Sequence, residues 1–233
     1  MSTMDINTGQ IAAHAGETER AAFIRRTYMH VAGALLALAA LLFVFIQTGI
    51  AASFTNLIVK LGGGYFWLAI MAMYMGVSVV ANKWAHSGVS KEVQYAGLGL
   101  YVVATALIFS PAILRSNSAL LSQAVLVTAA LAGGITFTAF TTKKNFSFLG
   151  SIVKTGMFVL MGVIVASILF GFQLGLLFLG AGILLMGAAL LYDTSNVIHE
   201  YRTTQHVAAS LSLFGSVSFL FYYVLQFMGM SGD

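Results

Sequence analysis

Long apolar stretches, interrupted by short polar segments, run along the chain from about residue 27 onward. A helix needs roughly 20 apolar residues to cross the hydrocarbon core of a membrane. The second stretch, 66–81, is short. Lys60 and glycines 62–64 form the turn before this stretch, and an alternative start of the span lies earlier, near Phe54. The pattern predicts an all-α, polytopic membrane protein, a bundle of seven transmembrane helices. The seven stretches are 27–47, 66–81, 93–114, 119–140, 148–170, 174–192 and 207–230.

The composition excludes a water-soluble domain. Hydrophobic residues make up 59% of the 233 residues and charged residues only 8%, whereas soluble domains carry roughly 25% charged residues. The chain has no cysteine, which excludes disulfides, thiol catalysis and thiolate metal sites. The net charge of +4 comes from basic residues scattered over loops, so we expect no nucleic-acid partner. We also expect no cofactor and no metal site; membrane lipids surround the protein.

The basic residues indicate the orientation in the membrane. With the N-terminus in the cytoplasm, nine Lys and Arg residues fall on the cytoplasmic side and two fall outside. Cytoplasmic loops of membrane proteins are enriched in these residues. The pattern therefore predicts a cytoplasmic N-terminus and, after an odd number of crossings, a C-terminus outside. The nine are Arg20, Arg25, Arg26, Lys83, Lys91, Lys143, Lys144, Lys154 and Arg202, and the two are Lys60 and Arg115.

The chain divides into a tail and one membrane domain. Residues 1–21 are polar and lack apolar periodicity, which predicts a disordered cytoplasmic tail. Residues 22–233 form the transmembrane domain. Its first apolar stretch is longer than the roughly 7 to 15 residues of a secretory signal, so we expect an uncleaved helix.

Small residues at four-residue spacing predict a helix contact. Ala129 with Gly133, and Gly162 with Ala166, follow this spacing in the fourth and fifth apolar stretches. Small residues let helix backbones approach closely in membranes. We therefore expect the fourth and fifth helices to pack against each other.

Asp193 directly follows the sixth apolar stretch, after the charge-free segment 155–192. A carboxylate at the C-terminal end of a helix lies at the negative end of the helix dipole. It therefore needs a cation, a donor or a proton, and Lys154 is one candidate partner, with Arg25 or Arg26 as another. Ionisable groups at membrane depth are candidates for function. The alternative is a carboxylate that simply lies in the headgroup region.

The histidines suggest a pH sensor. All five, His14, His30, His86, His199 and His206, fall on the expected cytoplasmic side. Histidine gains charge as the pH falls through about 6.5, and His199 or His206 would then pair with Asp193. The alternative is that loops on this side simply hold more polar residues.

Three segments carry a resemblance to a known family. They are "FIRRTYMHVAGALL", which leads into the first helix, "FTTKKNFSFLG" between the fourth and fifth, with Thr141, Thr142, Lys143 and Lys144, and "YDTSNVIHEY" with Tyr192, Asp193 and Thr194. Together they resemble the Bax-inhibitor family of seven-helix membrane proteins. Within that family they are most similar to the bacterial YccA-type branch, and the resemblance covers the whole chain after the tail.

The family resemblance implies a pH-sensitive calcium leak, sealed by an aspartate of the sixth helix paired with one of the seventh. Two carboxylates in contact share a proton, so the pair titrates. Asp193 matches the sixth-helix member, but the seventh-helix position falls at Ser216 or a neighbour, and the chain has no acid between Glu200 and Asp233. A Ser216 hydroxyl could still donate to Asp193, without the coupled titration. Asn145 also stands where many relatives have an acid.

The YccA-type branch implies a protein of the bacterial inner membrane that modulates FtsH, a membrane-anchored ATP-dependent protease, and is its substrate. The tail would be the handle that the protease grasps, and a tightly packed bundle would resist extraction. A calcium or proton leak with its gate at Asp193 stays the alternative, as does a different structural or stress-response role. No hydrolytic arrangement of serine, histidine and acid is visible, so we expect no enzyme.

Overall fold

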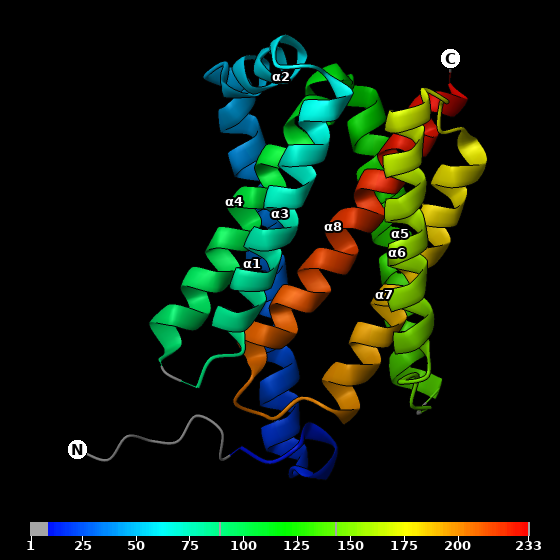
Figure 1. The fold of residues 1–233 in the computed structure, drawn as a ribbon. Helices are drawn as coiled ribbons and strands as arrows, with labels where there is room; N and C mark the ends of the chain where they lie inside the picture. The colour runs from blue at the N-terminus through cyan, green and yellow to red at the C-terminus, as the bar shows by residue number, and fades with distance from the viewer. Residues whose placement is uncertain (1–8, 89, 143, 233) are drawn as a thin grey trace.

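The computed structural model describes residues 9–88, 90–142 and 144–232. Within them, seven helices are long and apolar enough to cross a membrane, which confirms the predicted fold and number of spans. They run side by side, α1 beginning at one end of the bundle and α8 ending at the other (Figure 1). We call these the N-terminal end and the C-terminal end. The helices are α1 Glu17–Gln47, α2 Ile50–Lys60, α3 Gly64–Ala85, α4 Lys91–Arg115, α5 Ser118–Thr142, α6 Leu149–Phe170, α7 Leu176–His199 and α8 His206–Ser231.

Several helices extend beyond the apolar stretches that predict them. α1 begins at Glu17 rather than near residue 27, and α7 continues past Tyr192 to His199. Neither extension contains proline or glycine, the residues that most disfavour a helix interior. The backbone therefore stays helical after the side chains have become polar.

The short helix α2 replaces the alternative start of the second span. Its 11 residues span about 16 Å at 1.5 Å per residue, too little to cross roughly 30 Å of hydrocarbon. α2 lies across the C-terminal end of the bundle (Figure 1). Gly62 and Gly63 follow it with positive φ angles of 112° and 57°, a conformation that glycine adopts at little cost. Phe54 thus belongs to α2, and the second span begins at Gly64.

Residues 9–21 are ordered, which differs from the prediction of a disordered tail over residues 1–21. Ala12–His14 form a single 3-10 turn, and Ala12 is fully buried. The Ala12 amide donates to the Tyr201 carbonyl at 2.9 Å, and the Thr203 amide donates to the Gln10 carbonyl at 3.0 Å. The segment before α1 therefore docks on the loop between α7 and α8. The first eight residues lie outside the described part of the chain.

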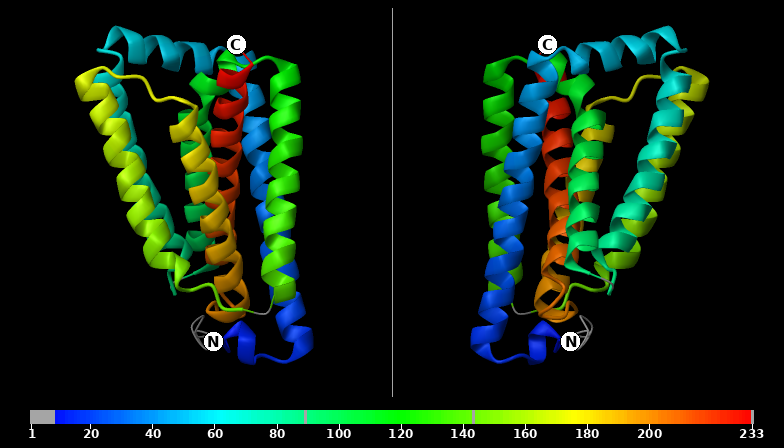
Figure 2. Two further views of the ribbon diagram at one scale, coloured as in Figure 1. Left: turned by 90° about the vertical axis from the view of Figure 1, so that its right-hand side faces the viewer. Right: turned by 90° about the vertical axis from the view of Figure 1, so that its left-hand side faces the viewer.

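Helix α8 forms the centre of the bundle. It contacts α1, α3, α4, α5 and α7, and both views in Figure 2 show it between the other spans. Its first half is rich in small residues that are buried, including Ala208, Ala209 and Gly215. Small side chains let neighbouring backbones approach, so the sequence of α8 favours a central position.

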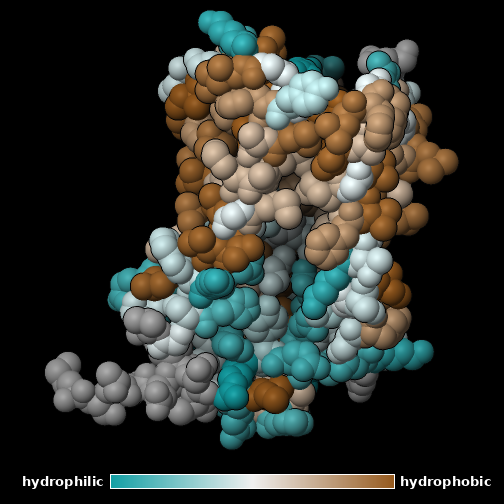
Figure 3. Space-filling view, viewed as in Figure 1, coloured by the Kyte–Doolittle hydropathy of each residue, from teal (hydrophilic) through white to brown (hydrophobic). Residues whose placement is uncertain are grey.

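The outer helices present apolar side chains to the surroundings. α3, α5 and α6 are the least buried spans, and large side chains such as Met73, Leu126 and Phe158 are mostly exposed on them. Figure 3 shows apolar residues over the part of the molecule toward the C-terminal end, and hydrophilic residues gathered at the N-terminal end. An exposed apolar surface of this size is typical of a lipid-facing protein.

The predicted contact between the fourth and fifth spans is wrong. Among the described residues, α5 packs on α7 and α8, whereas α6 packs on α7 and α3. A side chain added at Gly133 or Gly162 would meet nothing within 4 Å. These small residues therefore lie away from helix contacts.

Gly97 permits the contact between α3 and α4, and it supplies a test of the packing. A Cβ atom there would lie 2.7 Å from the Ala81 carbonyl oxygen and 2.9 Å from the Ala85 amide nitrogen. Because backbone atoms cannot move aside cheaply, we expect Gly97→Ala to lower the free energy of unfolding by about 1–3 kcal/mol. Gly99→Ala is the matched control, because a Cβ at Gly99 meets open space. Thermal unfolding in detergent measures both; equal midpoints would contradict the close contact.

Candidate functional site

Asp193 lies inside α7 rather than at its end. Six residues of helix follow it, up to His199, which places it about 9 Å from the helix terminus at 1.5 Å per residue. The helix dipole acts mainly within the last turn. The unfavourable interaction between the carboxylate and the helix dipole is therefore weaker than the sequence suggests. Asp193 lies within the bundle rather than exposed in the headgroup region.

A serine of α8 is the hydrogen-bond partner of Asp193. The Ser216 hydroxyl donates to Asp193 Oδ2 at 2.5 Å. The contact expected between these two residues is therefore present, and it joins α7 to the central helix. Its role in gating stays a prediction.

Asp193 and Ser216 share a cavity of about 270 Å³. Other polar groups on its wall are Asn82 from α3, Tyr101 from α4 and Ser212 from α8. A cavity needs space and two to four polar partners to hold a water molecule, and this one offers both. Most of the rest of the wall is apolar, so the carboxylate faces a partly polar chamber between helices.

The predicted basic partners of Asp193 lie elsewhere. Lys154, Arg25 and Arg26 are exposed, and in the described part of the chain the hydrogen bond recorded for Asp193 comes from Ser216. Of the expected alternatives, a neutral donor rather than a cation therefore contacts the carboxylate. The reason is the position of the carboxylate, which is turned toward α8 and the cavity.

The predicted pairing of Asp193 with His199 or His206 is not present either. His199 Nδ1 lies 3.0 Å from the carbonyl oxygen of Ser195 within the same helix. His206 is buried at the start of α8, and its Nε2 lies 3.3 Å from the Tyr95 hydroxyl. Neither ring is directed to Asp193, so the structure does not support the pH-sensing role for these two residues.

His206 belongs instead to a polar cluster that the sequence analysis missed. The Tyr95 hydroxyl also lies 3.0 Å from His30 Nε2, and the His30 and His206 rings are 5.1 Å apart. The cluster joins α1, α4 and α8 at the N-terminal end. No local sequence pattern indicates it, because its members are 65 and 111 residues apart.

The two family segments that flank α6 contact each other. A Cβ atom at Gly150 would lie 2.8 Å from the Tyr192 ring, so the aromatic ring packs directly on the glycine backbone. The Phe146 amide donates to the Ser195 hydroxyl at 2.9 Å. The two segments are therefore neighbours in space, because the loop before α6 packs on α7.

The other residues of these segments have local roles. Thr141 and Thr142 are exposed, and their hydroxyls donate to the carbonyls of Phe137 at 2.9 Å and Thr138 at 2.6 Å within α5. Thr194 is fully buried. Lys144 is exposed, and Lys143 lies outside the described residues. None of these contacts indicates chemistry.

Tyr201 connects the loop between α7 and α8 to the cavity wall. Its hydroxyl lies 3.0 Å from the Ser212 hydroxyl. Burial raises the pKa of Tyr201 to about 12, so the phenol stays protonated at physiological pH. This hydrogen bond therefore holds the loop on α8 without responding to pH.

The fold and the site define a class: a multi-pass membrane protein with seven candidate spans among its described residues, in which a carboxylate faces a partly polar chamber beside the central helix. Among the described residues, no group of three potential His, Cys, Asp or Glu ligands could hold a metal ion. Residues 20–233 match the family described as inhibitor of apoptosis-promoting Bax1. The protein therefore belongs to the Bax-inhibitor family.

Individual relatives are similar at modest identity. The chain is 33% identical over 123 residues to an uncharacterized protein of Pseudomonas aeruginosa, covering 51% of this chain and 54% of that protein. It is 27% identical over 141 residues to Bax inhibitor 1 of Schizosaccharomyces pombe, covering 58% and 52%. It is 35% identical over 94 residues to the modulator of FtsH protease YccA of Escherichia coli, covering 39% and 42%. The chain thus matches about half of the length of these relatives.

The hydrogen bond from Ser216 has a matched control two residues away. Ser216→Ala leaves the Asp193 carboxylate without its donor, and we expect the free energy of unfolding to fall by about 1–3 kcal/mol. Ser218 is fully buried on the same helix, and its hydroxyl has no hydrogen-bond partner among the described residues. Ser218→Ala should therefore be neutral or stabilising. Equal losses in thermal unfolding would show that the hydrogen bond adds nothing to stability.

Proposed function

We propose that this protein is a non-enzymatic modulator and substrate of an FtsH-type membrane protease. The proposal is carried by its similarity to the modulator of FtsH protease YccA. A substrate that resists extraction occupies a processive protease and slows it. The burial of α8 among five other helices supports this. Pulling α8 out of the bundle would break its contacts with all five.

The proposal includes an orientation and a place in the cell. The nine-to-two distribution of Lys and Arg supports a cytoplasmic N-terminus and an external C-terminus. Similarity to an Escherichia coli protein named inner membrane protein YccA supports the bacterial inner membrane. The end of α7 at His199 and the loop with Lys144 then face the cytoplasm, the compartment in which the ATPase ring of such a protease works.

The N-terminal segment is the proposed handle, in a shorter form than the sequence predicts. Residues from Gln10 onward dock on the loop between α7 and α8, and the Thr203 hydroxyl donates to Glu19 Oε1 at 2.6 Å. A protease that pulls on the N-terminus has to release this docked segment before it reaches α1. The docking therefore sets how easily degradation begins.

Deletion of residues 2–8 tests the handle without removing the docked segment. If the protease starts at the N-terminus, the deletion should lengthen the half-life of the protein and strengthen its inhibition of a second substrate. Thr203→Ala should shorten the half-life, because it weakens the docking of α1 on the loop. Pulse-chase measurements with and without the protease quantify both.

A control separates loosened docking from a general loss of stability. Ser151→Ala removes an exposed hydroxyl near the same end, which donates to the carbonyl of Phe148, the residue before α6, at 3.2 Å, and it should leave the half-life unchanged. Equal half-lives of the deletion variant and the wild type in the presence of the protease would contradict the handle.

The chamber at Asp193 supports a second candidate function, a calcium or proton leak with its gate at that residue. A carboxylate that faces a cavity of about 270 Å³ between helices is the arrangement expected of an ion or proton path. The hydrogen bond from Ser216 does not need a shared proton, so this leak would lack the coupled titration of a carboxylate pair.

The leak is tested in liposomes. Asp193→Asn should reduce the flux of calcium or protons to the level of protein-free vesicles. Ser216→Asp creates a carboxylate pair whose shared proton is lost as the pH rises; repulsion then separates α7 from α8, and the flux should rise steeply with pH. A wild-type flux at background, together with no flux in Ser216→Asp at any pH, would exclude this second function.

A further inference from the structure

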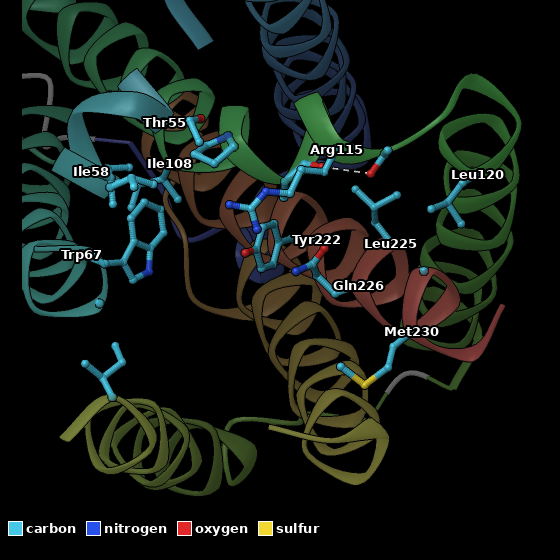
Figure 4. A pocket seen from close by; sticks show the side chains of 18 of the residues that line it. Thr55, Ile58, Trp67, Ile108, Arg115, Leu120, Tyr222, Leu225, Gln226 and Met230 are labelled. Carbon is cyan, nitrogen blue, oxygen red and sulfur yellow. Dashed lines mark hydrogen bonds between the residues drawn. The ribbon is translucent and has the colours of Figure 1, made fainter. Parts of the chain in front are cut away.

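A cavity of about 760 Å³ lies at the C-terminal end of the bundle, away from Asp193. Its wall combines residues of α2, α3, α4 and α8 with single residues of α5 and α6. Its size is within the range of about 300–1,000 Å³ that small-molecule pockets occupy. In Figure 4, the side chains of Arg115, Tyr222 and Gln226 point toward one another in the middle of this space.

Arg115 gives the cavity its charge. It is the one charged side chain among the described residues of the wall, and it is exposed. Tyr222, Gln226 and Asn117 add neutral hydrogen-bonding groups. A guanidinium group binds phosphate through two parallel N–H donors. The wall therefore offers a positive, hydrogen-bonding site. Its described residues include no carboxylate that could neutralise Arg115.

The charged cavity continues into an apolar one. A second cavity of about 240 Å³ shares Trp67, Tyr222, Gln226 and Met230 with the first. Most of its remaining wall is apolar and comes from α3, α6 and α7, including Met71, Ile164 and Phe178. A free phosphate ion would leave this apolar surface unmatched, whereas an acyl chain would cover it. The ligand should therefore be an amphiphile.

The position of α2 supports the same ligand class. Thr55, Ile58 and Val59 of this helix line the cavity, and the glycine turn at 62–63 returns the chain to α3. Short amphipathic helices lie at the boundary between headgroups and acyl chains. The cavity below α2 is thus at the depth where a lipid phosphate meets its acyl chains.

We propose that this cavity binds an anionic phospholipid, with its phosphate on Arg115 and one acyl chain in the apolar extension. The proposal is independent of the protease and of the leak. It distinguishes a lipid from a free anion, because only the lipid uses both parts of the cavity.

Native mass spectrometry of the full-length protein in detergent tests the proposal. The protein is titrated with phosphatidylglycerol and with phosphatidylcholine of the same acyl chains. The wild type should prefer phosphatidylglycerol, and Arg115→Gln should weaken its binding about tenfold or more, as expected for the loss of charge-assisted hydrogen bonds. Lys60→Gln is the matched control, because Lys60 is the other basic residue expected at this end and does not line the cavity. It should bind as the wild type does.

Two further variants keep the test decisive. Met71→Trp fills the apolar extension and keeps Arg115, so it should weaken lipid binding and abolish the dependence on acyl-chain length. Asp233 lies outside the described residues and is the acid nearest to this end in the sequence; Asp233→Asn should leave the lipid preference unchanged or strengthen it. Thermal unfolding of each variant confirms that it is folded.

Four results would overturn the proposal. The first is binding by Arg115→Gln that equals the wild type. The second is an equal loss in Lys60→Gln, which indicates attraction to a charged surface. The third is displacement of the lipid by millimolar inorganic phosphate with no effect of Met71→Trp, which indicates a site for a free anion. The fourth is a lipid preference that appears only in Asp233→Asn, which indicates that the chain's own carboxylate occupies Arg115.

Discussion

The close packing of α8 is the constraint on which the arrangement of the other helices depends. Lipid supplies no hydrophobic force between helices, so their contacts come from close fit and from hydrogen bonds. α8 has both. Its small residues let the neighbouring helices approach, and two of its serines bond to different neighbours: Ser210 donates to the Thr27 carbonyl of α1 at 3.0 Å, and Ser216 donates to Asp193 of α7. The central helix is thereby fixed on two sides.

The sequence predicts the spans well because lipid requires each one to be a long apolar helix. It predicts their contacts poorly. The pairs at Gly133 and Gly162 have the spacing of a helix contact but lie away from one, because small residues also occur where a helix faces lipid. The ends of α7 were missed for a related reason: the apolar stretch ends at Tyr192, but the backbone stays helical to His199. α2 enters the prediction only as an alternative start of the second span near Phe54, because both segments are apolar and only the glycine turn separates them.

At the candidate site, too, the sequence predicts one feature and misses others. The contact between Asp193 and Ser216 followed from the positions that the two residues share with family members, which report on three-dimensional neighbours. The predicted histidine pairing rests on the shared cytoplasmic side of these residues, and a shared side permits contacts without selecting among them. His206 instead contacts Tyr95, 111 residues away. A cluster of this kind depends on how α1, α4 and α8 meet, which no pattern along a single helix contains.

The serine at position 216 changes what the junction of α7 and α8 does. A carboxylate pair stays together only while it shares a proton, and separates when both groups ionise. A hydroxyl donates to a carboxylate that is charged, and it can also bond to the neutral acid, so the contact between Ser216 and Asp193 persists across the titration. The junction is then a fixed contact rather than a pH-dependent one. A fixed contact on the most buried helix raises the resistance of the bundle to extraction, and it removes the device by which a carboxylate pair would open a path. The same residue therefore supports the proposed role of protease modulator over the proposed gated leak.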